Sequence, residues 1–129
     1  MRGAPPPVTA TMTSTDGVVL MQFTRRSEHP GDARPDAPPL IVVEVAGDID
    51  AETEPLLHKT LTQTVRGNRR VCCDLGRVGF LGAAAVRTIL AAVGEAERAG
   101  CDFTVRGLHG FGVRVFQVSG LDAFLASRR

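Results

Sequence analysis

The sequence predicts a single α/β domain in which helices cover a mostly parallel or mixed β-sheet. Short β-branched runs of strand length alternate with longer segments that repeat apolar residues at helical spacing. The chain has 129 residues, enough for one hydrophobic core but too few for two comfortable domains. Because each helix returns the chain to the start of a neighbouring strand, alternating strands and helices indicate one sheet with crossover connections.

Residues 1–39 are expected to form a flexible N-terminal tail with a hairpin and a proline-rich loop. The segments 3–7 and 29–39 are rich in proline, which has no backbone N–H to give to a helix or a sheet. Between them, VTATMT and GVVLMQF are separated by a Thr-Asp-Gly turn sequence, which favours a β-hairpin. The main domain is expected over residues 40–129, with a core that extends back to about residue 8.

From residue 40 onward the predicted strands and helices alternate. LIVVEVAG (40–47) is a strand, and the next segment is a helix with Asp50 as its cap and Leu57, Leu61 and Val65 on one face. RRVCCDL (69–75) is a second strand of this region.

The second helix is predicted to begin within FLGAAAVRTIL (80–90). Val86, Ile89, Leu90 and Val93 form an apolar stripe at helical spacing, and Gly100 ends it. CDFTVRG (101–107) is the last strand, and the segment from Gly110 onward favours a helix, although its valines also suit a strand.

Composition argues against several classes of function. The formal net charge is only +1, so a nucleic-acid partner is not expected. No apolar run reaches the roughly 20 residues of a membrane-spanning helix, and the N-terminus has no hydrophobic signal core. These observations predict a cytoplasmic protein without a membrane partner.

The sequence does not support an enzyme, a metal site or a cofactor. His29, His58 and His109 are far apart and have no further ligand at metal-binding spacing, and no nucleophile stands beside a base. Three cysteines, Cys72, Cys73 and Cys101, cannot form a disulfide framework and are typical of small buried packing residues. A redox switch at these cysteines is the alternative.

Four segments, read in order, resemble the STAS domain of bacterial anti-sigma factor antagonists. The resemblance covers about residues 40–125, and its most specific parts are Gly47-Asp48-Ile49-Asp50 and the segment 115–121. It implies a small mixed sheet covered by helices on one side. The matching segments are VVEVAGDIDAETEPLLHKTL, RRVCCDLGRVGFLGAAAV, AGCDFTVRGL and GVRVFQVSGLDAFL.

The resemblance also implies a partner and shows a departure from the family pattern. Such antagonists bind an anti-sigma factor that is also a GHKL-type serine kinase, and phosphorylation of one serine in an Asp-Ser-Ser-Gly motif releases it. Here Gly82-Ala83-Ala84-Ala85 stands at that motif, and Ala83 at the phosphoacceptor position has no hydroxyl. Asp48, Asp50, Arg87 and the residues 82–85 are the expected contact residues, with capping as the alternative role of Asp50.

The expected function is therefore partner switching in transcription control without the usual off-switch. A scaffold or accessory subunit of a stress-signalling or lipid-transport complex is the alternative. Thr88 and Ser119 are the hydroxyls nearest to the lost acceptor, and the sequence leaves open whether two copies of the chain form a homodimer.

Overall fold

The computed structural model describes residues 8–29 and 36–124. The proline-rich segment 3–7 and residues 30–35 of the expected loop lie outside the described residues. Five strands form one sheet, in the order of the chain from edge to edge. They are β1 (Val8–Thr13), β2 (Val19–Glu28), β3 (Leu40–Ile49), β4 (Arg70–Leu81) and β5 (Asp102–Arg106).

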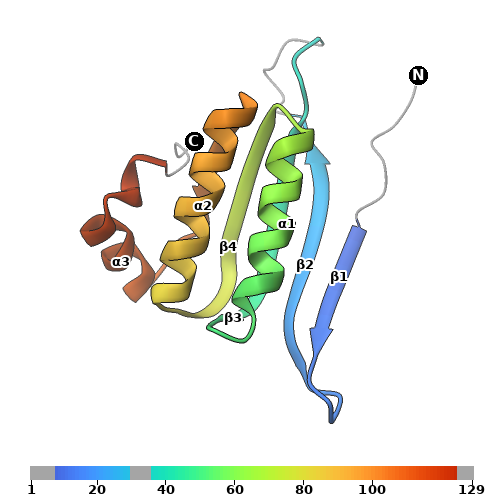
Figure 1. Cartoon of the computed structure of the whole chain (residues 1–129), viewed down its shortest axis with the longest axis vertical. Coiled ribbons are helices and arrows are strands. Elements are labelled where there is room, and N and C mark those ends of the chain that lie inside the picture. Colours follow the sequence, from blue (N-terminus) through green and yellow to red (C-terminus); the bar gives the residue numbers. More distant parts are fainter. Residues whose placement is uncertain (1–7, 30–35, 125–129) are drawn as a thin grey trace.

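The sheet is mixed, as the sequence predicted. The pairs β1–β2 and β2–β3 are antiparallel, whereas β3–β4 and β4–β5 are parallel. The helices α1 (Glu54–Gly67) and α2 (Ala83–Ala99) connect the parallel strands and lie on the same face of the sheet (Figure 1). The segment from Gly110 onward is helical, with α3 (Phe111–Ser119) beside α2 and a short 3₁₀ helix, η1 (Leu121–Phe124), after it.

The predicted core face of α1 is confirmed, and that of α2 is partly wrong. Leu57, Leu61 and Val65 of α1 are fully buried against the sheet. In α2, Ile89 and Val93 are buried as expected, but Leu90 is 50% exposed. Four alanines and Thr88 take the remaining buried positions, and the small alanine side chains let α2 approach the sheet closely. The buried residues of α2 are Ala84, Ala85, Thr88, Ile89, Ala92, Val93 and Ala96.

Strand β4 continues six residues beyond the predicted end at Leu75 and finishes at Leu81. Its second half pairs with β3 in a shifted register, with Gly47 level with Val78 and Ile49 level with Leu81. The sequence analysis ended this strand at Leu75, but the parallel pairing with β3 keeps the next six residues extended. This extension carries the chain to the start of α2.

The face of the sheet opposite the helices is closed by ion pairs. Arg106 of β5 donates to both carboxylate oxygens of Glu28 in β2, at 3.1 and 2.8 Å, and to Asp74 of β4 at 3.0 Å. The Arg106 guanidinium holds the pKa of Glu28 below its usual value. Since β3 and β4 separate β2 from β5, this bridge crosses the middle of the sheet, which explains why Cys72 is only 1% exposed there.

Within residues 8–29 and 36–124, none of the helices combines the length and the apolar character that crossing a membrane requires.

Candidate functional site

The site begins where β4 ends, and Asp48 fixes the position of that end. The Oδ1 atom of Asp48 accepts the backbone N–H of Phe80 at 2.8 Å, across from β3 to β4. A Cβ on Gly79 would lie 2.8 Å from the same oxygen, so a side chain at this position would displace the Asp48 carboxylate from its bond to Phe80. Asp48 therefore sits at the predicted site, but its carboxylate is used to hold β4 beside β3.

Phe80 is the most prominent apolar side chain of the site, and the sequence analysis did not single it out. It is 56% exposed, at the end of β4. A Cβ on Gly82 would lie 3.0 and 3.1 Å from two carbons of the Phe80 ring, so the ring rests directly over the Gly82 backbone. The signal in the sequence was the spacing Gly79-Phe80-Leu81-Gly82, with a glycine on each side where a side chain would collide.

The first turn of α2 has no side-chain cap. Gly82 is the N-cap residue and has an extended backbone, and no side chain bonds the N–H groups of the first turn. Ala83 is exposed, whereas Ala84 and Ala85 are 6% and 0% exposed and point into the core. Of the four predicted motif residues, only Gly82 and Ala83 are thus at the surface.

Asp50 supports the neighbouring start of α1. Its Oδ1 accepts the backbone N–H groups of Glu52 and Thr53 at 3.0 and 3.1 Å. The sequence analysis predicted Asp50 as the cap of the helix, but the cap residue of α1 is Thr53. Asp50 instead stabilises the turn that precedes the helix. These two bonds are reason enough for an aspartate at position 50, and no binding partner is needed to explain it. Asp50 is half-buried.

Glu54 connects the two helices near their starts. Its carboxylate accepts from Arg87 Nη2 at 3.4 Å and from the Thr88 hydroxyl at 3.3 Å. The Arg87 side chain is 60% exposed and projects beside Ala83, which suits a contact residue. Thr88 is only 1% exposed, so its hydroxyl is closed to a kinase in the folded protein, whereas Ser119 is exposed at the end of α3.

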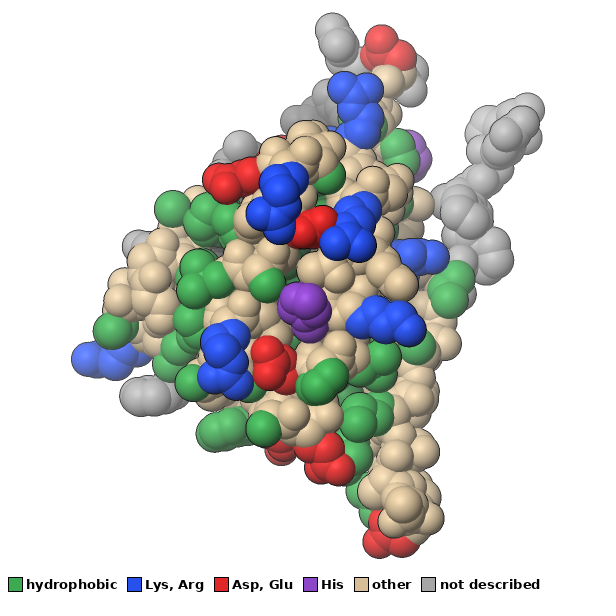
Figure 2. Space-filling view, viewed as in Figure 1, with side chains coloured by type: hydrophobic (Ala, Val, Ile, Leu, Met, Phe, Trp, Pro, Cys, Tyr) green, Lys and Arg blue, Asp and Glu red, His purple; other side chains and the backbone are tan. Residues whose placement is uncertain are grey.

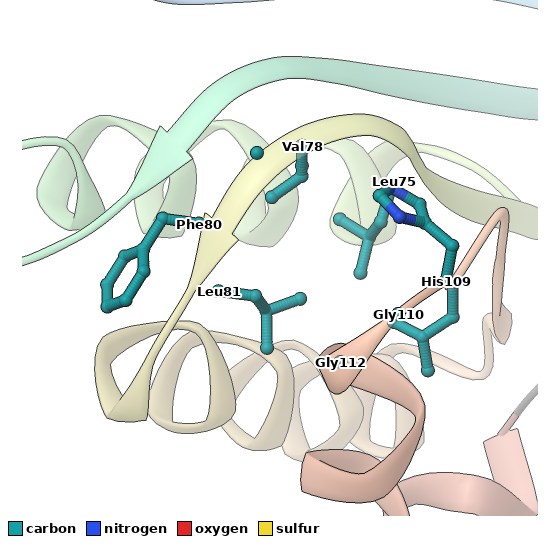
Figure 3. Close-up of a pocket in the computed structure, with 9 residues that line it drawn as sticks. Leu75, Val78, Phe80, Leu81, His109, Gly110 and Gly112 are labelled. Carbon is teal, nitrogen blue, oxygen red and sulfur yellow. The ribbon is translucent and has the colours of Figure 1, made fainter.

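A hollow of about 180 Å³ opens beside Phe80, between the end of β4 and the start of α3. Figure 3 shows Leu75, Val78 and Leu81 of β4 on one side and His109 with the first residues of α3 on the other. Gly112 leaves room there, because a Cβ on it would touch Leu81 at 3.7 Å. The hollow is mostly apolar and has the size of one or two side chains.

Exposed apolar side chains continue from this hollow along α2 and α3. Figure 2 shows hydrophobic side chains over α3 and the adjoining side of α2, whereas charged and histidine side chains lie over α1 and also over α2. Leu90 is 50%, Val113 36% and Val118 81% exposed. Single exposed apolar side chains are common on protein surfaces, and these three give α2 and α3 an apolar border.

The three cysteines are not brought together. All three are free and buried, and burial raises the pKa of each thiol. Cys72 pairs in register with Thr104 and Cys73 with Val105, which are three and four residues along β5 from Cys101. At about 3.3 Å per residue they are too far from Cys101 for a disulfide. Redox control stays a prediction, which thiol titration under oxidant, with Cys101→Ser as control, would test.

Comparison with known proteins identifies relatives by sequence pattern and by fold. A family model described as "Mlab, STAS domain" matches residues 35–126. A crystal structure of an anti-sigma factor antagonist from Mycobacterium paratuberculosis is 23% identical, with a TM-score of 0.61 over 88% of this chain and 87% of that chain. Among curated protein sequences, none gives a significant match.

Two further structures have the same fold. SpoIIAA in its unphosphorylated form is 15% identical, with a TM-score of 0.62 over 81% of this chain and 88% of that chain. The Bacillus cell fate determinant SpoIIAA in its phosphorylated form is 16% identical, with a TM-score of 0.59 over 81% of this chain and 91% of that chain.

Proposed function

Since the chain belongs to the STAS domain family described as Mlab, we propose that it binds an anti-sigma factor of the GHKL serine-kinase type and is not released by phosphorylation. The fold it shares with anti-sigma factor antagonists supports the choice of partner. One observation carries the second half of the proposal. Ala83, at the phosphoacceptor position of the resemblance, is exposed and has no hydroxyl.

The chemistry of the start of α2 explains why this alanine matters. A phosphate on a side chain here would add a charge of about −1.5 to −2 at the place where a partner packs. With Ala83 the surface stays uncharged, while the backbone N–H groups of the first turn remain without a side-chain cap. A partner can therefore be received at this helix start, but the kinase finds no hydroxyl to phosphorylate at position 83.

The proposed contact surface combines an apolar corner with a cation. Phe80 over Gly82 and the hollow behind it offer an anchor for an apolar side chain of the partner. Arg87 stands next to this corner with most of its side chain in solvent. Ala84 and Ala85 contribute through their backbone, and Asp48 and Asp50 shape the surface while keeping some contact with solvent.

The test compares the natural chain with an Ala83→Ser variant. Each protein is incubated with a candidate anti-sigma kinase and ATP, and complex formation and phosphoryl transfer are followed together. We expect the natural chain to stay bound without being phosphorylated, and the variant to bind without ATP but to be phosphorylated and released when ATP is added. Phosphorylation of the natural chain coupled to its release would contradict the proposal, as would the absence of any complex.

The missing hydroxyl also favours a second candidate, a non-switching scaffold or an accessory subunit of a stress-signalling or lipid-transport complex. A permanent subunit has no need of a release step, so an uncharged Ala83 suits it equally well. Purification under mild conditions separates the two. Recovery of a serine kinase in stoichiometric amount supports the first candidate, and recovery of transporter or assembly subunits supports the second.

A further inference from the structure

Strand β1 forms an open edge of the sheet. Within the described residues, β1 pairs with β2 alone, so the backbone groups along its other side face solvent. Figure 1 shows β1 at the border of the sheet, on the side away from α2 and α3. Five of its six residues are exposed, and Val8 is 57% exposed.

This edge lacks charged residues and proline, which usually keep an edge strand from pairing, and its pairing with β2 is regular from Val8 to Met12 and shifts only between Met12 and Thr13. VTATMT contains no charged residue and no proline, and its β-branched residues favour an extended backbone. The opposite edge, β5, is one residue shorter, carries a charged residue at each end and packs against η1. The molecule therefore protects one edge of its sheet and leaves the other available.

We propose that β1 pairs with β1 of a second copy of this chain, in an antiparallel arrangement centred on Ala10. Centring the pair on Ala10 sets a register in which apolar residues face apolar residues on one side of the strands and threonines face threonines on the other. Ala10 then faces Ala10 of the second copy, Val8 faces Met12, and Thr9 faces Thr11. The pair is symmetric, so one surface serves both copies, as in most homodimers.

The pairing continues the apolar face that already lies under the helices. Within one chain, Ala10 is level with Phe23 and Met12 with Met21, and both of these β2 residues belong to the buried core. In the pair, Val8 of one copy extends the row of Met12 and Met21 in the other. In the pair the Val8 side chain, which is 57% exposed in one chain, packs beside Met12 of the other copy.

On the other face the pairing brings threonines together. Thr9 already lies 3.4 Å from Thr24 of β2 through their hydroxyl oxygens, so this side of β1 carries a row of hydroxyls. Cross-strand threonine pairs are favourable in antiparallel sheets. No like charges meet on either face of the proposed pair, since neither strand has any.

The dimer is expected to be weak, because two six-residue strands bury less surface than the roughly 1,200 Å² of a small specific interface. It is independent of the proposed function, since β1 and the start of α2 are at different places on the molecule (Figure 1). Sedimentation equilibrium over a wide range of protein concentration measures it. The average mass should rise from the 13.7 kDa of one chain toward twice that value.

The matched variants are Ala10→Lys and Val118→Lys. The first places two ammonium groups face to face at the centre of the pair and should give a monomer at every concentration. The second makes the same chemical change to a large exposed apolar residue of α3, 81% exposed, and should leave the association as it is. Circular dichroism spectra that agree with those of the natural chain show that both variants are folded.

Amide hydrogen exchange of the natural chain gives a test that needs no variant. As the concentration rises, exchange in residues 8–13 should slow several-fold, while exchange in α3 should not change. A natural chain that remains a monomer at all concentrations would overturn the proposal. A dimer that persists in Ala10→Lys, or that protects α3 and not β1, would overturn it as well.

Discussion

The two long helices begin side by side and neither has a side-chain cap, but the residues that lead into them are bonded in different ways. Before α1, Asp50 accepts two backbone N–H groups, and the buried hydroxyl of Thr53 donates to the Asp48 carbonyl at 2.7 Å and accepts the N–H of Asp50 at 3.0 Å. At α2, Gly82 and Ala83 offer no side-chain bond at all. The turn before α1 is thus held by side-chain bonds and is called the bonded start, whereas the start of α2 has none and is called the open start.

The difference teaches how a small domain keeps an unfilled site in a defined place. Asp48 contributes to both starts, because its carbonyl accepts from Thr53 and its carboxylate holds Phe80. The bonded turn before α1 therefore holds Asp48 in place, and Asp48 holds the end of β4. An open helix start is normally a cost in stability, and here neighbouring bonds offset it.

The largest expected effect comes from Gly79→Ala, which removes the link between the two starts. The new Cβ would collide with Asp48 Oδ1, so the bond to Phe80 has to break or the strand has to move. We expect a loss of about 2 kcal/mol in the free energy of unfolding, measured with urea. Partner binding should weaken too, because Phe80 loses its position.

Gly94→Ala is the matched control for that change. Gly94 lies within α2, and a Cβ there would meet only the end of the Arg98 side chain, at 3.8 Å. It should stabilise the protein by up to about 1 kcal/mol, because alanine favours a helix more than glycine does. Equal losses at the two glycines would show that the contact between Asp48 and β4 is not what stabilises this end of the strand.

The next effect concerns the bonded start alone. Thr53→Val keeps the shape of a side chain that is 2% exposed but removes its hydroxyl, leaving the Asp50 N–H and the Asp48 carbonyl without this partner. We expect a loss of about 1–3 kcal/mol in the free energy of unfolding.

Thr60→Val gives the comparison within the same helix. The Thr60 hydroxyl donates to the Leu56 carbonyl at 2.8 Å, which lies within α1 and has its own place in the helical bonding. Its loss should change the free energy of unfolding by less than about 0.5 kcal/mol. If Thr53→Val lowered the free energy of unfolding as little as Thr60→Val, the side-chain bonds before α1 would not stabilise the protein measurably.

The sequence predicted the architecture better than the site because the two depend on different contacts. Alternating strands and helices, and the stripe of Leu57, Leu61 and Val65, are local patterns, and the structure and the fold relatives confirm the mixed sheet with helices on one face. Leu90 was wrongly placed in the core because the pattern counted large residues, whereas the close contact of α2 with the sheet is made by alanines.

The site depends on contacts between residues far apart in the chain. Asp48 bonds Phe80 across 32 positions, and no local pattern reveals that its carboxylate is used in this way. The exposure of Phe80 likewise follows from the extension of β4, which the sequence analysis ended at Leu75. The resemblance located Ala83, but only the packing of α2 shows that Ala84 and Ala85 face inward.

A smaller effect on stability, with a large one on binding, is expected from Ala83→Asp. A carboxylate in the first turn of α2 interacts favourably with the unpaired N–H groups, which should stabilise the protein by about 0.3–1 kcal/mol. The same charge imitates part of the effect of a phosphate and should abolish partner binding. Urea denaturation and a binding titration of one variant thus give changes of opposite sign.

Ala99→Asp controls for the charge itself. Ala99 is exposed in the last turn of the same helix, where a carboxylate lies at the negative end of the helix dipole. This variant should be destabilised by a similar amount and should bind the partner normally. Weakened binding in both variants would mean that net charge, and not the start of α2, determines recognition.

The smallest change in stability is expected from Arg87→Ala, a variant that tests whether Arg87 takes part in partner binding at the start of α2. Arg87→Ala removes a 3.4 Å ion pair with Glu54 whose arginine is 60% exposed, and such surface pairs contribute less than about 1 kcal/mol. Arg98→Ala removes an arginine that is 71% exposed and paired with Glu95 at the other end of α2. Both variants should unfold at nearly the same urea concentration as the natural chain, since water replaces each lost pair. Only Arg87→Ala should weaken the partner complex. If the two variants bound the partner equally well, Arg87 would be a solvated surface residue, and the proposed site would be restricted to Phe80, Gly82 and Ala83.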